Sequence, residues 1–145
     1  MTKILTGLAA IALIALAPLA RAAELSEPPA GSAERKAILD AIRPAVEAQL
    51  RTRVEFRIGL MLTDGDWAYV VAEPQHPDGG AIDPKSTAFA DMIETMDGLT
   101  TYGLARFANG RWNHISDLIG PTDAAFLGWK QTFGVPGNVL GEGAN

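Results

Sequence analysis

Cysteine is absent from this chain of 145 residues, and its absence excludes several kinds of chemistry at once. A chain without thiols forms no disulfides, has no thiol nucleophile, binds no metal through thiolates and carries no lipid anchor on a cysteine. We therefore expect packing alone to hold the fold together, around a substantial hydrophobic core.

Long apolar runs are also scarce, and the longest one lies at the N-terminus. Ile4 to Ala17 carries no charge and follows the basic Lys3. This arrangement is typical of a signal peptide, and Ala20 and Ala22 supply the small residues that signal peptidase accepts. The run is shorter than the roughly 20 residues that span a bilayer. We therefore expect cleavage after Ala22 and no stable membrane insertion of the 123 residues that remain.

Positive charge is in the minority, with 12 Lys and Arg against 17 Asp and Glu. The predicted signal peptide contains Lys3 and Arg21 but no acid, so its removal moves the formal net charge from −5 to −7. Nucleic acids and anionic lipids are bound through clustered Lys and Arg. Basic residues do gather between Arg35 and Arg57, but acids interleave with them, so neither partner is expected.

Motifs for nucleotides and metals are missing as well. The sequence contains no glycine-rich phosphate loop, no calcium loop of the EF-hand type and no paired-histidine zinc helix. His76, Asp78 and Asp83 lie in one loop, but their spacing fits no known cation site. Asp64 and Asp66 flank a glycine and suit a tight turn. We predict no metal and no cofactor.

Apolar spacing predicts a helix over residues 33–50. Ser32 is a suitable N-cap, and Glu34 lies in the first turn, where the helix dipole favours an acid. Pro44 falls inside the helix and predicts a kink, because it removes one hydrogen bond while the apolar stripe continues on both sides. The stripe has helical spacing and consists of Ile38, Ile42, Val46 and Leu50.

Two hairpins are predicted after this helix. The first joins an alternating strand to a second over residues 67–72, and the first strand is expected to place Val54, Phe56, Ile58, Leu60 and Leu62 on one face. The second hairpin joins residues 99–108 to residues 111–119. Asn109 and Gly110 between them favour a type I′ turn.

Shorter elements and loops complete the prediction. Residues 74–84 contain three prolines and two adjacent glycines and are expected to form a loop. Helical spacing predicts a short helix over residues 86–96 and another over residues 125–133, which Gly134 would end.

The predicted architecture is α+β, with an N-terminal kinked helix packed on a four-stranded antiparallel sheet made of two hairpins, and with short extra helices. The expected organisation is a signal peptide over residues 1–22, a flexible linker over 23–31, one domain over 32–136 and a flexible tail over 137–145.

This layout resembles the cystatin-like and NTF2-like folds, which implies a sheet that curls around the helix and leaves a cone. The Gln-x-Val-x-Gly loop of cystatin inhibitors is absent, and nothing matches the acid and base residues of the NTF2-like isomerases and dehydratases. Short segments resemble motifs of small exported bacterial proteins without assigned activity, which implies no functional residues. These segments are Asp66-Trp67-Ala68, Gly110-Arg111-Trp112 and Gly120-Pro121-Thr122-Asp123 followed by Trp129.

Three residues are candidates for acid–base catalysis, namely His114, Asp117 and Asp123. In a regular strand, His114 and Trp112 share one face and Asp117 lies on the other, which would separate the histidine from the acid. Asp123 is also suited to cap the start of a helix.

Aromatic residues are the candidates for ligand binding. Trp112, Tyr69 and Tyr102, together with Trp67 and Trp129, could line a pocket for an apolar or cyclic ligand, and the two tyrosines could assist an acid–base reaction. The same side chains could instead form the core.

Three hypotheses for function follow. The first is a non-enzymatic exported domain, periplasmic or extracellular, that binds an envelope protein or a small ligand through its sheet, the sheet edges or the proline-rich loop. The second is a cone-shaped enzyme that transfers protons through His114 or a nearby acid. The third is an inhibitor of a secreted enzyme that inserts a hairpin tip or the proline-rich loop.

Overall fold

The computed structural model describes residues 24–143, and they form the α+β fold that the sequence predicts. The predicted signal peptide, residues 1–22, lies outside the described residues. Of the helices within this range, none combines the length and apolar character that crossing a membrane requires. The helices and strands are α1 (Ala33–Leu50), β1 (Glu55–Thr63), β2 (Trp67–Gln75), β3 (Thr101–Ala108), β4 (Arg111–Ile119) and α2 (Trp129–Phe133).

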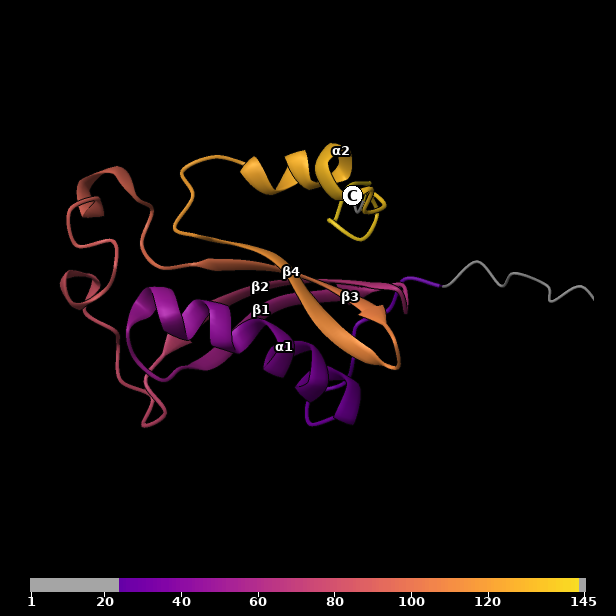
Figure 1. Cartoon of the computed structure of the whole chain (residues 1–145), viewed down its shortest axis with the longest axis horizontal. Helices are drawn as coiled ribbons and strands as arrows, with labels where there is room; N and C mark the ends of the chain where they lie inside the picture. Colours follow the sequence, from indigo (N-terminus) through magenta and orange to yellow (C-terminus); the bar gives the residue numbers. More distant parts are fainter. Residues whose placement is uncertain (1–23, 144–145) are drawn as a thin grey trace, which may run out of the picture.

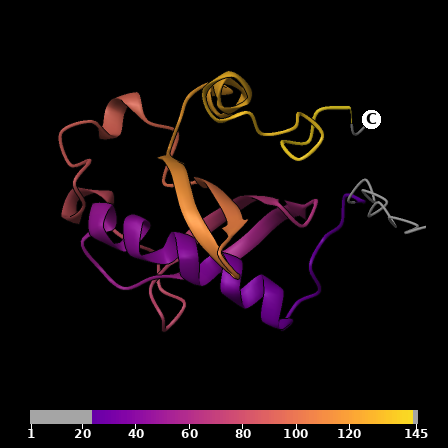
Figure 2. The same ribbon diagram turned by 45° about the vertical axis from the view of Figure 1, so that its right-hand side comes forward.

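The four strands form one antiparallel sheet in the order β1-β2-β3-β4. Figure 1 shows α1 below the sheet and the segment that contains α2 above it, and the turned view in Figure 2 shows the same order of layers. We call this upper segment, residues 121–143, the C-terminal strap. The domain therefore has three layers, because each face of the sheet is apolar and each is covered.

Helix α1 has the predicted bounds and is continuous through Pro44. Its N-cap is Ser32, whose side chain accepts a hydrogen bond from the Arg35 amide at 3.2 Å. The helix approaches β3 closely at Gly103, where an added Cβ would lie 2.8 Å from Cδ1 of Ile42. The predicted apolar stripe is the buried side of the helix and comprises Ile38, Ile42, Val46 and Leu50.

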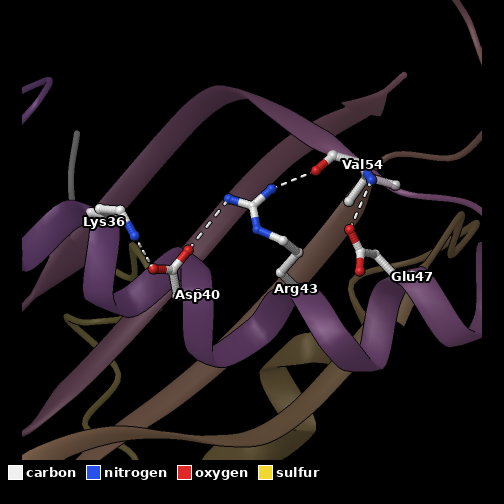
Figure 3. A network of polar contacts seen from close by, with 5 residues as sticks. All are labelled: Lys36, Asp40, Arg43, Glu47 and Val54. Carbon is white, nitrogen blue, oxygen red and sulfur yellow. Dashed lines mark hydrogen bonds and ion pairs between the residues drawn. The ribbon is translucent and has the colours of Figure 1, made fainter. Parts of the chain in front are cut away.

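Polar side chains of α1 fix the point where the chain enters β1 (Figure 3). Arg43 donates to the carbonyl of Val54, and Glu47 accepts from the amide of the same residue at 3.0 Å. Asp40 pairs with Lys36 and lies 3.6 Å from the Arg43 guanidinium. Part of the basic cluster noted in the sequence is thus engaged within the domain.

Two hydrophobic clusters lie on opposite faces of the sheet. The helix-side core consists of Ile38, Ile42, Val46, Leu50, Val54, Met61, Ala68, Val70, Ala72, Ile82, Ala105 and Ile119. The strap-side core consists of Trp67, Tyr69, Leu104, Trp129, Val135, Val139 and Leu140. Residues of β2 and β3 alternate between the two cores, so the middle of the sheet is buried on both sides.

A β-bulge at Gly59 changes the face of residues in β1. The register with β2 shifts between Ile58 and Leu60, which leaves Gly59 as the extra residue. Leu60 consequently packs against the strap-side core, whereas Met61 is fully buried in the helix-side core. The prediction that the alternating apolar residues share one face is wrong beyond the bulge, because one inserted residue reverses the alternation.

Pro74 lies inside β2, so the predicted loop begins later than expected. Pro74 pairs with Phe56 of β1, but the pairing of β2 with β3 covers only Trp67 to Ala72. At Pro74 the strand therefore has a neighbour on one side only, which is the kind of edge position where a sheet tolerates proline.

The predicted short helix over residues 86–96 is wrong. A 3₁₀ segment, Pro84–Ser86, ends where this stretch begins, and a second one, Ile93–Thr95, is the only helical segment within it. The Thr87 hydroxyl donates to the Pro84 carbonyl at 2.7 Å and accepts from the Phe89 amide at 3.1 Å. Such local side-chain bonds compete with the backbone bonds of a helix, and they stabilise a turn instead.

The segments expected to be flexible are packed against the domain where the structure describes them. Ser26 forms a β-bridge with Thr63 through backbone bonds of 2.8 and 2.9 Å, and Pro28 is buried. Val139 and Leu140 are buried in the strap-side core. The predicted closing helix is present as a 3₁₀ turn followed by α2, and Gly134 ends it with a φ of +74°.

Candidate functional site

His114 and Asp117 meet on the side of β4 that faces α1. Nε2 of His114 lies 2.7 Å from Oδ1 of Asp117. The sequence placed these side chains on opposite faces, on the condition that the strand is regular. That condition is not met, so the predicted separation is wrong.

A second β-bulge is the cause. The register of β4 with β3 pairs His114 and Ser116 with neighbouring residues of β3, which leaves Ile115 as the extra residue. One inserted residue shifts the alternation of side chains by one position. Asp117 therefore lies on the same face as His114, and Ile115 packs against the strap-side core.

The carboxylate of Asp117 accepts a hydrogen bond at each oxygen. Nε2 of Gln49, in α1, donates to Oδ2 of Asp117 at 2.6 Å and to the Ala45 carbonyl at 3.1 Å. The Asp117 side chain is 7% exposed and the His114 side chain is 30% exposed. Because an ionised carboxylate only accepts, His114 donates through Nε2, and the three side chains link the end of α1 to β4.

This arrangement supplies part of what acid–base catalysis requires. A nearly buried carboxylate that orients a partly exposed imidazole is the base-and-orienter half of a catalytic triad. Within residues 24–143 no side chain forms a hydrogen bond with Nδ1 of His114. The same contacts also serve as a structural tie between helix and strand.

Asp123, the third catalytic candidate, lies elsewhere, in an exposed position at the start of the strap. The 3₁₀ segment that follows, Ala125–Gly128, has Ala124 as its N-cap and no side-chain capping bond. The predicted capping role of Asp123 is therefore wrong.

Tyr69 and Tyr102 belong to the sheet face under the strap rather than to an open pocket. Tyr69 is 2% exposed, and its ring lies 5.5 Å from that of Phe126 and 6.4 Å from that of Trp129. Burial, together with the neighbouring Tyr102, raises the pKa of the Tyr69 phenol above its ordinary value. The phenol is therefore neutral at physiological pH and has no access to an external substrate. Trp67 is buried in the same core.

The acids of the two turns make local hydrogen bonds. Asp78 and Asp83 each accept a backbone amide two residues ahead at 2.9 Å, and Asp64 accepts two amides in the predicted turn before β2. Nδ1 of His76 lies 3.4 Å from the Thr52 hydroxyl. Across the described part of the chain, three or more His, Asp or Glu residues nowhere gather in a way that could hold a metal ion.

An open groove lies between the first half of α1 and the tip of the β3–β4 hairpin. It has a volume of about 650 Å³. We call it the aromatic groove, and it is lined by Glu34, Ala37, Asp40, Ala41, Phe107, Gly110, Arg111 and Trp112.

Phe107 and Trp112 form the aromatic wall of this groove. Their rings pack edge to face with centroids 5.4 Å apart, and Phe107 remains 42% exposed. The turn beside them has positive φ at both Asn109 and Gly110, as the sequence predicts. Sequence reasoning singled out Trp112 but missed Phe107, although equal distance from the turn makes the two a cross-strand pair.

Comparison with known proteins provides no relative. No family model, no curated protein and no solved structure matches the chain significantly.

Replacing Gln49 with alanine should lower the free energy of unfolding by about 1–3 kcal/mol, because Oδ2 of the nearly buried Asp117 carboxylate loses its donor. Urea denaturation measures this change. Gln131→Ala, at an exposed position of α2, is the matched control and should change stability by less than about 0.5 kcal/mol. Equal stabilities of the two variants would contradict the proposed link between α1 and β4.

Proposed function

We propose that this protein is an exported binding domain that recognises a segment of another protein in the aromatic groove. The observation that carries the proposal is the aromatic pair of Phe107, which is exposed, and Trp112, which is partly buried. Ala37 and Ala41 of α1 line the groove beside them. Aromatic side chains are the usual anchors of protein interfaces, because they bury a large area at a small cost in conformational entropy.

The openness of the groove favours a protein partner over a small ligand. Sites for small molecules bury most of the ligand's surface in a concave pocket. The aromatic groove instead runs along the surface between a helix and a hairpin, and a segment of chain can lie in it with one side chain against the aromatic wall.

Charge around the groove specifies the partner further. Glu34 and Asp40 lie on the helix side, and Arg111 lies on the hairpin side. Asp40 is paired with Lys36 and Arg43, whereas Glu34 forms no ion pair with any described residue. A segment with an apolar side chain next to a basic residue would satisfy both the aromatic wall and Glu34.

Selection of displayed random peptides on the purified protein tests this proposal. We expect enriched peptides to carry an apolar residue adjacent to Lys or Arg. Phe107→Ala and Trp112→Ala should each weaken their binding at least about tenfold, as loss of an interface anchor does. Glu34→Gln should weaken it by a few-fold, mainly at low salt.

Met92→Ala is the control, because Met92 is 53% exposed and does not line the groove. It should bind the selected peptides like the unaltered protein. Peptides that bind Phe107→Ala and Trp112→Ala with unchanged affinity, while circular dichroism shows both variants folded, would refute the groove as the binding site.

Export is the second part of the proposal, and it rests on the sequence of residues 1–22. Expression of the full chain in a bacterial host, followed by fractionation and mass spectrometry, should recover a protein that begins at Ala23 in the periplasm or the medium. Replacing Ala20 and Ala22 with larger residues should prevent cleavage. A cytoplasmic protein that retains residues 1–22 would contradict export.

A second candidate function is acid–base catalysis, and the contact between His114 and Asp117 favours it. Its function class is that of the NTF2-like enzymes, whose layout this sequence resembles without matching their acid and base residues. The imidazole is partly exposed, and its Nδ1 is the atom that would take or give a proton.

This candidate requires a fixed tautomer of His114. Nitrogen-15 chemical shifts of the neutral ring should report a proton on Nε2 and a lone pair on Nδ1, because Asp117 accepts from Nε2. In Asp117→Leu the preference should fall to that of a free imidazole, while the shifts of His76 stay unchanged. A neutral ring protonated at Nδ1 in the unaltered protein would exclude Nδ1 as the base.

A further inference from the structure

The hydrogen bonds of the C-terminal strap are internal to it. Within residues 24–143, every hydrogen bond of residues 121–143 joins two residues of the strap. Examples are the amide of Gly134, which donates to the Lys130 carbonyl at 3.0 Å, and the ammonium of Lys130, which donates to the Glu142 carboxylate at 2.5 Å. None of these bonds needs the sheet as a partner.

Apolar side chains alone attach the strap to the sheet. Trp129, Val135, Val139 and Leu140 are at most 5% exposed and pack in the strap-side core. The ring of Phe126 stacks on that of Tyr102 at a centroid distance of 5.1 Å and an interplanar angle of 9°. Such contacts are non-directional and are lost together when the segment moves away.

The rest of the domain does not depend on the strap. The four strands form their hydrogen bonds with one another, so the sheet keeps all of these bonds when the strap detaches. Helix α1 packs on β3 and β4 through the helix-side core, on the other face of the sheet. The base of the strap is fixed at Gly120, whose amide donates to the Thr100 carbonyl at 2.8 Å and whose carbonyl accepts from the Asp97 amide at 3.1 Å.

We propose that the C-terminal strap is a cover that opens as one unit about Gly120 and uncovers the aromatic face of Tyr69 and Tyr102, while the sheet and α1 stay folded. The opened state keeps the helix-side core and loses only the strap-side contacts. This device is independent of the aromatic groove, which is lined by residues of α1 and by Trp112 and therefore lies on the helix side of the sheet.

Native-state hydrogen exchange on the purified protein tests the proposal. Once detached from the sheet, the five-residue helix and the turns of the strap are too short to keep their internal hydrogen bonds. The amides of Gly134, Val139 and Leu140, which are bonded within the strap, should therefore be protected at least roughly 100-fold less than the amides at the centre of β2. Their exchange should also depend less on added urea, because opening the strap exposes less surface than global unfolding.

Two substitutions separate local opening from global unfolding. Ile42→Val weakens only the helix-side core, so it should speed exchange in α1 and β2 about two- to tenfold and leave the strap amides unchanged. Val139→Ala weakens strap contacts that are lost both when the strap opens and when the whole domain unfolds. It should therefore speed exchange in the strap and in β2 alike. Equal protection of strap and β2 amides, or a strap that responds to Ile42→Val as strongly as β2 does, would overturn the proposal.

Discussion

Burial of both faces of one four-stranded sheet is the constraint on which the rest of this structure depends. A chain without cysteine relies on packing, and the middle strands β2 and β3 carry apolar side chains on both sides. Each face therefore needs its own cover. Helix α1 supplies one cover through residues such as Ile42, and the C-terminal strap supplies the other through residues such as Trp129.

The two β-bulges decide which side chains each cover meets. The bulge at Gly59 keeps Met61 in the helix-side core, and the bulge at Ile115 directs Asp117 toward Gln49. In a regular β4, the Asp117 carboxylate would point toward the strap-side core, where a charge is costly to bury. The polar contact that most resembles a catalytic pair is thus a result of how the outer strands are packed.

Features set by neighbouring residues could be predicted from the sequence, and features set by pairing between strands could not. Ser32 marks the start of α1, and Asn109 with Gly110 marks the hairpin turn, because caps and tight turns depend on local backbone chemistry. A bulge depends on how a strand pairs with its partner. The alternation of apolar and polar residues along one strand does not show where a residue is inserted. Gln49 and Asp117 lie 68 positions apart, so no local pattern joins them.

The placement of the sites also determines how they can influence one another. Trp112 of the aromatic groove and His114 share the face of β4 that looks toward α1, two positions apart, so a segment bound in the groove lies beside the helix–strand interface. The strap lies across the sheet from both. Any effect of its opening on the groove must therefore cross the sheet, through β3, where Leu104 belongs to the strap-side core and Ala105 to the helix-side core, or through β4, where Ile115 packs against the strap-side core. Because the proposed opening leaves the hydrogen-bonded pairing of β3 with its neighbours intact, we expect the groove to keep its walls whether the strap is open or closed.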